Sequence, residues 1–333
     1  VAFVPDDEGG FAPPVQRNRK IFHWRMKKIR QEFKRYSRWS SPISRTQFCE
    51  YYEGRKRGIY EAAVESLDTE PLTARDSFLK YFLKGEKVNF TLKPNPAQRL
   101  ISPRSPRYNV EVGRYLKPIE PQIYKSVTAI FGTKTIFKGL NPYTRGKVLF
   151  EKWNRFTRPV AVGLDASRFD QHVSRIALEW EHSIYTLYYP GDGRLKRLLS
   201  AQLFQRGTAY LHNAKIKFTK EGGRCSGDMN TALGNCLIMC SLVKSYCDSR
   251  GIKFELANDG DDCVVIIEEE NLQQFSTGLY EWFLQMGFKM KVEPPVRIFE
   301  QIDFCQTHPV LVDGNYIMVR DPRVALCKDA ISI

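Results

Sequence analysis

The sequence carries the segment Asn258-Asp259-Gly260-Asp261-Asp262 between two apolar stretches, residues 252–257 and 263–267. Each flanking stretch has the composition of a β-strand, and Asp-Gly between two such stretches is a strong signal for a tight hairpin. The bend of that hairpin would hold Asp261 and Asp262 where both carboxylates can face a cation. Crowded carboxylates repel each other and raise each other's pKa unless positive charge lies between them. The segment therefore predicts a β-hairpin that carries a divalent metal site.

The charge of the chain is divided unevenly along its length. The net charge is +14, and residues 1–160 contain 32 Lys and Arg against 15 Asp and Glu, whereas residues 161–333 contain 19 against 22. We interpret the basic half as a surface that follows a polyanion and the acidic half as the site of metal-assisted chemistry. A generically basic surface is the alternative. A length of 333 residues suits roughly two domains.

The eight cysteines contain no C-x-x-C pair, and several lie in apolar stretches. This pattern is typical of reduced, buried thiols rather than of zinc ligands, and it fits a reducing, cytosolic compartment. No apolar run approaches the ~20 residues that a membrane span requires. Because Val1 is not a start methionine, the absence of a targeting signal has little weight.

Periodicity predicts an α+β protein. Residues 1–20 are expected to form a loose arm, and residues 20–38 a basic helix with one apolar stripe. The Pro-rich residues 93–121 are expected to form rigid loops that present Arg99, Arg104, Arg107 and Arg114 to phosphates. Asp228 is expected to cap the helix that follows it. Further helices are predicted over 44–67, 73–83, 173–188, 229–246 and 272–286, a basic connection over 191–207, and strands over 159–164, 298–304 and 316–319.

Asp165 follows the buried strand predicted over residues 159–164. If that strand lies beside the hairpin, Asp165, Asp261 and Asp262 would form a cage for two cations. Such a pair can activate an attacking hydroxyl and stabilise the leaving oxygen of a phosphoryl displacement. Mg²⁺ accepts carboxylates together with substrate phosphates, and Mn²⁺ is expected to substitute for it. For Asp165 taken alone, a helix N-cap is the alternative role.

The segment from Arg224 to Asn235 is predicted to be a Ser-Gly turn that leads into a helix. Thr231 and Asn235 are spaced i,i+4, so they share one face of that helix. Polar groups on an otherwise apolar helix need partners, and a nucleotide ribose could provide them. The alternative is a Thr that caps the backbone and an Asn that is satisfied within the core.

These residues together resemble a known family. Asp165 with Asp170, Ser226-Gly227 with Thr231 and Asn235, and Gly260-Asp261-Asp262 occur in the order of palm motifs A, B and C of viral RNA-dependent RNA polymerases. Residues 48–57, 102–116 and 165–174 are similar to the tombusvirus group of plus-strand RNA viruses. The resemblance covers roughly residues 45–310, and three ordered motifs with an arginine-rich block are far more specific than Gly-Asp-Asp alone.

The resemblance implies a role for each matching residue. Asp165 and Asp261 would be the main metal ligands, with Asp262 close by, and all three would be catalytic. The ribose 2′-hydroxyl would be recognised by Asp170 and Asn235 together with Ser226, Gly227 and Thr231. Lys93 and Arg99 would neutralise the triphosphate. Lys289 or Lys291 would protonate pyrophosphate, although either could be a surface lysine. Phe304-Cys305-Gln306 would be a turn that grips the primer strand.

The resemblance also implies a right-hand polymerase with fingers and a palm. Residues 1–40 would form a basic arm, 41–157 the fingers, 158–190 the palm with motif A, 191–220 a fingers insertion, 221–310 the palm with motifs B to E, and 311–333 the start of a thumb. Since family members continue well beyond motif E, the thumb is expected to be short or truncated.

The implied reaction is attack of an RNA 3′-hydroxyl on the α-phosphate of an NTP, with release of pyrophosphate. The implied partners are template and nascent RNA, NTPs, an auxiliary viral replicase protein and a membrane-associated replication complex in the host cytoplasm, but not DNA. A reverse transcriptase is disfavoured by Gly260 and Asn235. A non-catalytic RNA-binding or coat-like protein would leave Asp165, Asp261 and Asp262 unexplained.

Overall fold

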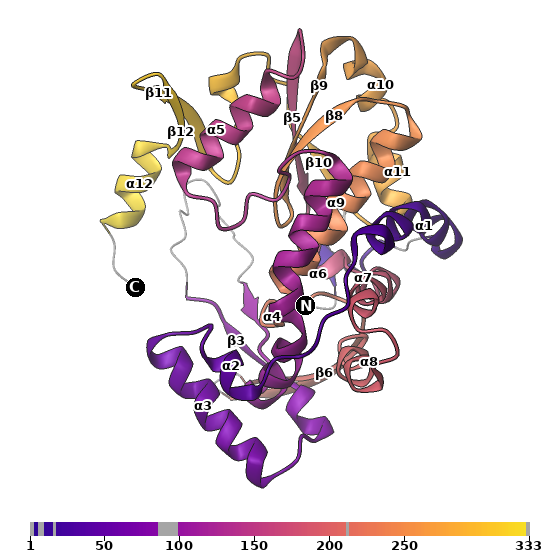
Figure 1. Ribbon diagram of the computed structural model, residues 1–333, viewed down its shortest axis with the longest axis vertical. Helices are drawn as coiled ribbons and strands as arrows, with labels where there is room; N and C mark the ends of the chain where they lie inside the picture. Colours follow the sequence, from indigo (N-terminus) through magenta and orange to yellow (C-terminus); the bar gives the residue numbers. More distant parts are fainter. Residues whose placement is uncertain (1–2, 6–9, 16–17, 86–98, 211–212, 331–333) are drawn as a thin grey trace.

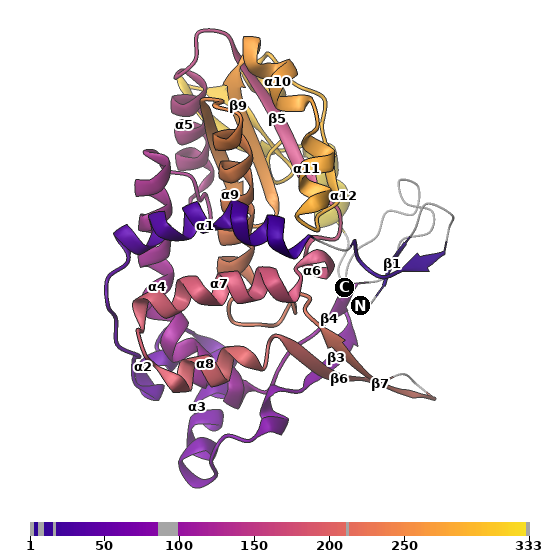
Figure 2. The same ribbon diagram turned by 90° about the vertical axis from the view of Figure 1, so that its right-hand side faces the viewer.

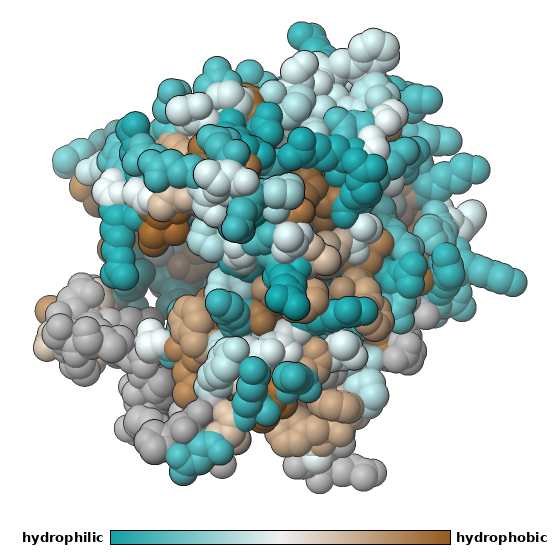
Figure 3. All heavy atoms as spheres, turned by 90° about the horizontal axis from the view of Figure 1, so that it is seen from below, coloured by the Kyte–Doolittle hydropathy of each residue, from teal (hydrophilic) through white to brown (hydrophobic). Residues whose placement is uncertain are grey.

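The computed structural model describes residues 3–5, 10–15, 18–85, 99–210 and 213–330. The chain forms a mixed α and β structure in which one four-stranded sheet lies among helices in the upper part and a second lies in the lower part (Figure 1). This agrees with the predicted α+β class. Hydrophilic side chains cover much of the surface seen from below, with hydrophobic ones exposed among them (Figure 3).

The central sheet has the strand order β10-β5-β9-β8, and all of its pairs are antiparallel. Its strands are β5 (Pro159–Ala166), β8 (Phe254–Asp259), β9 (Asp262–Glu268) and β10 (Met290–Val292). The predicted hairpin over 252–267 and the predicted strand over 159–164 are thereby confirmed. On β5, Val160, Val162 and Leu164 enter the larger core, whereas Ala161 enters a second core on the opposite face.

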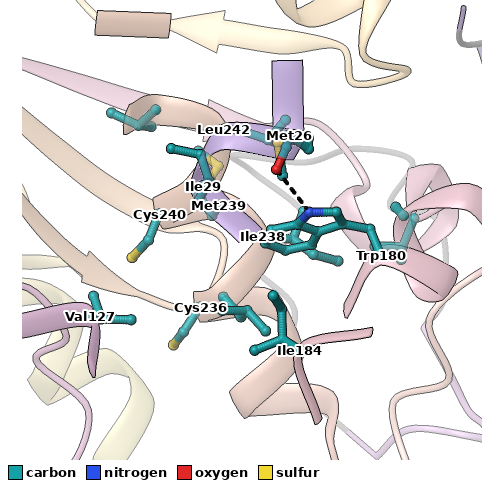
Figure 4. Close-up of a cluster of buried hydrophobic side chains, with 14 of the residues drawn as sticks. Met26, Ile29, Val127, Trp180, Ile184, Cys236, Ile238, Met239, Cys240 and Leu242 are labelled. Atoms are coloured by element: carbon teal, nitrogen blue, oxygen red, sulfur yellow. Dashed lines mark hydrogen bonds between the residues drawn. The ribbon is translucent and has the colours of Figure 1, made fainter. Parts of the chain in front are cut away.

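Helices cover the larger-core face of this sheet. They are α1 (Arg19–Tyr36), α7 (Arg175–Tyr188), α9 (Thr231–Ser249), α10 (Leu272–Ser276) and α11 (Leu279–Gln285). Figure 4 shows side chains of α1, α7 and α9 meeting there, with the indole N–H of Trp180 donating to the carbonyl of Met26 (3.3 Å). The basic helix predicted over 20–38 is confirmed, since Phe22, Met26, Ile29 and Phe33 form its buried stripe. The helix predicted over 272–286 is interrupted at Gly278, where φ is +71°.

The expected rigid loops over 93–121 are wrong for the described residues of that segment. The helix α4 (Pro106–Phe131) occupies most of it and contains Pro118 and Pro121. Pro106 lies in the first turn, where its missing N–H removes no intrahelical bond, and Gly132 ends the helix with φ +75°. The buried residues Val112, Leu116, Ile119, Ile123 and Val127 pack α4 into the larger core. Tertiary burial therefore outweighs the cost of the two internal prolines.

The other face of the central sheet packs on α5 (Pro142–Trp153), the 3-10 helix η3 (Phe299–Gln301) and the hairpin of β11 (Thr307–Val312) and β12 (Asn315–Arg320). Aromatic rings make this contact, with Phe299 lying 4.6 Å from Tyr316 and 5.6 Å from Trp153 between ring centroids. The strand predicted over 316–319 is confirmed within β12, whereas residues 298–304 form η3 and flanking coil. Helix α12 (Pro322–Asp329) follows β12.

The second sheet has the order β4-β3-β6-β7, with β3 and β6 parallel. Its strands are β3 (Leu79–Leu83), β4 (Leu100–Ile101), β6 (Phe204–Tyr210) and β7 (Lys215–Glu221). The helix predicted over 73–83 is therefore wrong, because η1 (Ala74–Ser77) and β3 occupy that segment. The connection predicted over 191–207 instead contains α8 (Gly193–Ser200) and the start of β6.

The remaining elements are short or peripheral. The helix predicted over 44–67 is divided into α2 (Arg45–Cys49) and α3 (Gly54–Thr69). The strands β1 (Val4–Pro5) and β2 (Phe11–Ala12) pair within the predicted arm. The last two are α6 (Phe169–His172) and η2 (Glu269–Asn271). Six of the eight free cysteines are buried, which confirms the expected reduced thiols. Within the described ranges no helix is long and apolar enough to cross a membrane.

Candidate active site

The hairpin turn consists of Gly260 and Asp261, flanked by the paired residues Asp259 and Asp262. Gly260 has φ +82°, the region in which only glycine is free of Cβ strain, and a positive φ at the first central position is the geometry of a type II′ turn. The buried side chain of Asn258 donates to the carbonyls of Gly260 (2.8 Å) and Asp262 (3.2 Å). The amide of Gly260 donates to Sγ of Cys236 on α9 (3.2 Å). The turn is therefore tied both to its own strand and to the helix behind it.

The strand register sets Asp165, Asp262 and Lys291 in one row. Leu164 pairs with Cys263 and Lys291 pairs with Asp165, so continuing the register by one residue places Asp165 opposite Asp262. Directly opposed residues project from the same face of a sheet. Leu164 and Cys263 enter the larger core, so Asp165 and Asp262 lie on the opposite face. The structure thus brings Asp165 and Asp262 together on the sheet face opposite the larger core.

The carboxylates are strongly coupled. Burial, assisted by the negative charges of Asp170, Asp262 and Asp165, raises the pKa of Asp261 to about 6. Burial and the neighbouring Asp165 also raise the pKa of Asp262. Within the described residues, Lys and Arg form no ion pair with Asp165, Asp261 or Asp262, whereas Asp259 pairs with Arg145 and Lys138. The uncompensated negative charge is the arrangement that a bound cation would relieve.

Hard carboxylate oxygens without a cationic partner suit Mg²⁺ or Mn²⁺. The described part of the chain nevertheless contains no group of three or more His, Cys, Asp or Glu side chains arranged to hold a metal ion. The chemistry of the carboxylate ligands fits a divalent cation, but the described side chains do not converge on one point as they would around a bound ion.

This electrostatic coupling predicts how pH changes stability. Because the pKa of Asp261 is raised from its usual 3.8 to about 6, its ionised form destabilises the fold above pH 6, and this cost disappears as the pH falls toward 4. We expect Asp261→Asn to be more stable than the metal-free wild type at pH 7.5, on the order of 2 kcal/mol, and nearly equal to it below about pH 4. Thermal unfolding in EDTA measures this difference. A stability difference that does not change with pH would contradict the predicted coupling.

Asp170 and Asn235 are brought together by α6 and α9. The amide of Asn235 donates to Oδ1 of Asp170 (2.9 Å), and the backbone amide of Arg224 donates to the carbonyl of Asp170 (2.7 Å). The side chain of Arg224 donates in turn to Oδ1 of Asn235 (3.0 Å). Residues from motifs that are 65 positions apart therefore form one hydrogen-bonded unit beside the hairpin.

Beneath this unit lies a buried ion pair that our sequence analysis missed. Arg224 and Glu181 are both fully buried and are joined by two hydrogen bonds. Although burial opposes it, the pairing with Arg224 lowers the pKa of Glu181. Glu181 also accepts from Asn230 (2.6 Å) and Tyr185 (2.7 Å). Glu181 is spaced four residues from both Ala177 and Tyr185, so a Glu on the apolar face of the helix predicted over 173–188 was the signal that could have revealed it.

The Ser-Gly turn packs against the second sheet. Pro103 forms a parallel bridge with Gly227, and a Cβ on Gly227 would lie 2.6 Å from Cα of Pro103, so only glycine fits there. The amide of Ser226 donates to Oγ of Ser102 (3.2 Å). The hydroxyl of Thr231 donates to the carbonyls of Cys225 and Asp228, so this residue caps the backbone, as the alternative interpretation held.

Several basic residues occupy places that differ from those expected. Arg104 is buried in an ion pair with Asp228, so it does not present its charge on a loop and Asp228 is not the N-cap. The residue before α9 is Asn230. Arg107 pairs with Asp76, and Arg114 with Glu111. Arg99 lies just before β4, where its carbonyl accepts from the amide of Lys84 (2.9 Å), and Lys93 lies outside the described residues.

Phe304, Cys305 and Gln306 form a tight turn whose two central residues, Cys305 and Gln306, have φ of 55° and 61°. Phe304 is buried against Phe137, with 5.4 Å between ring centroids, so only the two central residues reach the surface. The nearby Asp262 and Asp259 carboxylates add to the effect of burial, which raises the pKa of Cys305 to about 12. The turn therefore lies next to the carboxylate row.

The carbonyl of Lys289 accepts from the amide of Ser167 (2.9 Å).

Comparisons with known proteins relate the chain to one family. The family described as "Viral RNA dependent RNA polymerase" matches residues 1–333. The chain is 49% identical over 306 residues to an RNA-directed RNA polymerase of Tobacco necrosis virus (strain A), covering 92% of this chain and 42% of the relative. It is 50% identical to that of Tomato bushy stunt virus (strain Cherry), covering 85% and 34%, and 44% identical to that of Panicum mosaic virus (strain United States/Kansas 109S), covering 99% and 33%. The chain thus spans less than half the length of these relatives.

Proposed function

Because the chain belongs to the viral RNA-dependent RNA polymerase family, we propose that it catalyses template-directed transfer of a nucleotide from an NTP to the 3′-hydroxyl of RNA, with release of pyrophosphate. The observation that carries this proposal is the row formed by Asp165 and Asp262 on one sheet face, with Asp261 at the adjoining turn. Asp170 and Asn235, joined by a hydrogen bond, supply a candidate reader of the sugar beside it.

In the proposed mechanism, Asp165, Asp261 and Asp262 would hold Mg²⁺, for which Mn²⁺ could substitute. When bound, the cations would promote attack by the hydroxyl and stabilise the oxygen that leaves. The three side chains must be ionised to act in this way, so the raised pKa of Asp261, about 6 without metal, makes metal affinity fall as the pH drops below that value. Lys291 faces the same side of the sheet as Asp165, which supports it over Lys289 as the acid that protonates pyrophosphate.

The proposed sugar recognition rests on a preorganised hydrogen-bonding pair. Asn235 donates to Asp170 and accepts from Arg224, so the orientation of its amide is defined. A 2′-hydroxyl can both donate and accept, so it could add to this pair whereas a deoxyribose could not. Thr231 would then act by holding the backbone of the Ser226-Gly227 turn rather than by touching the sugar. Lys93 and Arg99 are proposed to bind the triphosphate.

A right-hand layout is proposed for the two sheets. The central sheet and its helices would be the palm (158–190 and 221–310), and the second sheet would belong to the fingers (41–157 and 191–220), with a basic arm over 1–40. Residues 311–333 would begin the thumb, and Phe304-Cys305-Gln306 would contact the primer. The proposed partners are template RNA, NTPs, an auxiliary viral replicase protein and a membrane-associated replication complex in the host cytoplasm.

A primer-extension assay tests the proposal, with this chain and a longer chain from the same replicase in parallel. We expect extension of an RNA primer on an RNA template with NTPs and Mg²⁺ or Mn²⁺, none in EDTA, and much less with dNTPs. Equal use of dNTPs would favour a reverse transcriptase. RNA binding that needs no metal, with no extension by either chain, would favour a non-catalytic RNA-binding protein.

A further inference from the structure

One face of the second sheet is exposed and carries a regular pattern of basic and aromatic side chains. We define the basic sheet face as the outward residues of β3, β6 and β7, which are Lys80, Phe82, Phe204, Arg206, Thr208, Tyr210, Lys215, Lys217, Thr219 and Glu221. The other face holds the buried Leu79 and Tyr81, which pack with Cys225. Figure 2 shows β6 and β7 extending beyond the helices, and the side chains of Arg206, Lys215 and Lys217 on them are exposed.

The strand register arranges these side chains in rows. Lys80 pairs with Thr208, which pairs with Lys217, so two lysines flank a hydroxyl across three strands. In the next row Tyr210 pairs with Lys215, whose ammonium lies 5.1 Å from the centre of the Tyr210 ring. Arg206 pairs with Thr219 in the row on the other side. Directly opposed residues share a face, so the cations form a continuous patch.

The positive charge of this patch is not neutralised by neighbouring carboxylates in the described residues. Within the described residues, Lys80, Arg206, Lys215 and Lys217 form no ion pair with a carboxylate, and the nearest acid in the register, Glu221, is paired with Arg175. The aromatic side chains are also available, since Phe82, Phe204 and Tyr210 expose 55%, 52% and 59% of their surface. Exposed rings beside unpaired cations on a sheet provide stacking for bases and charge for phosphates.

We propose that the basic sheet face binds single-stranded RNA. The choice of RNA rather than an anionic membrane rests on the alternation of cations, rings and Thr hydroxyls, since a membrane surface would favour a contiguous apolar face beside the cations. Behind this face, the Cys225 thiol and the Gly223 carbonyl both bond the buried side chain of Gln205, so β6 is tied to the segment that leads into the Ser-Gly turn of the candidate active site. The inference depends on the proposed function only in taking RNA as the natural ligand.

Fluorescence anisotropy with a labelled oligouridylate of about 20 nucleotides tests the proposal. We expect Lys80→Gln/Lys215→Gln/Lys217→Gln to bind about tenfold more weakly or worse, and the slope of log K against log salt to fall in magnitude by about 2. Tyr210→Ala is expected to weaken binding about fivefold or more while the salt slope is unchanged. The matched control Lys125→Gln/Lys147→Gln/Lys196→Gln removes equal charge from exposed lysines elsewhere and should change affinity about twofold or less.

Three outcomes would overturn the proposal. They are wild-type affinity in the Lys80/Lys215/Lys217 variant, an equal loss in the control, and loss of binding to phosphatidylserine vesicles while RNA binding is retained. The same preparations in primer extension separate this proposal from the proposed function. If the variant loses RNA binding and even the wild type gives no extension, the proposed RNA surface is supported and the proposed polymerase activity is rejected. If extension is normal and the variant binds RNA as the wild type does, the polymerase activity is supported and the RNA surface is rejected.

Discussion

The Asp261→Asn variant is expected to incorporate nucleotides at least about a thousandfold more slowly than the wild type, while its fold and its affinity for RNA are retained. The change keeps the size of the side chain and removes the negative charge that would hold a cation at the turn. Metal stabilisation of the developing charge contributes several kcal/mol, and about 4 kcal/mol corresponds to this factor. Single-nucleotide extension under saturating NTP and Mg²⁺ measures the rate.

Asp259→Asn is the matched control, because it makes the same chemical change two residues away in the same hairpin. Asp259 is neutralised by Arg145 and Lys138, so we expect its replacement to leave incorporation within about tenfold of the wild type. A wild-type rate in Asp261→Asn would remove the proposed role of this carboxylate. An equal loss in both variants would indicate damage to the hairpin rather than loss of a metal ligand.

The second large effect is expected at the buried Arg224–Glu181 ion pair. Removing one partner leaves the other charge uncompensated in the core, which costs about 3–5 kcal/mol. We therefore expect Glu181→Gln and Arg224→Met each to lower the free energy of unfolding by that amount, measured by urea denaturation. Because Arg224 also orients Asn235, the Arg224→Met variant should in addition prefer NTPs over dNTPs less strongly.

The double variant Glu181→Leu/Arg224→Met separates these two effects. With both charges removed, the fold should recover much of the lost stability, since apolar replacement of a buried pair is often neutral. The preference for NTPs should nevertheless stay low, because Asn235 still lacks its donor. Single variants that each cost less than about 1 kcal/mol would contradict the expected cost of breaking the buried ion pair. A double variant with full sugar selectivity would contradict the positioning role assigned to Arg224.

The elements that sequence analysis predicted correctly are those whose patterns are local. The β8–β9 hairpin has a turn signal between two apolar stretches, and α7 and α9 have a strong apolar content. Helix α4 was missed because Pro118 and Pro121 argue against a helix in the local sequence. The apolar i,i+4 pattern of α4 stabilises a helix only when it packs against segments that are distant in sequence. The parallel pairing of β3 with β6 joins segments more than 120 residues apart, and no local sequence pattern predicts that pairing.

The same distinction holds within the candidate site. The order of the motifs already suggested that Asp165, Asp170, Asn235 and the hairpin carboxylates belong together, and the structure places them side by side. Charge alone did not show which basic residues are structural. Arg104 and Arg224 are equally basic in the sequence, yet both are buried and paired with acids that lie 124 and 43 residues away. A buried Arg needs an acidic partner because burial removes its water, and which acid lies beside it is decided by the tertiary fold.

The bond from the Gly260 amide to Cys236 has a consequence for how such an enzyme can change. Cys236 is the neighbour of Asn235 on α9, so the turn that carries Asp261 and the residue proposed to read the sugar rest on adjacent positions of one helix. A substitution that shifts this part of α9 moves both. Under the proposed function, selectivity for ribose and the rate of synthesis are therefore linked through this helix. A substitution here that lowers the selectivity for ribose is expected to lower the rate of synthesis as well.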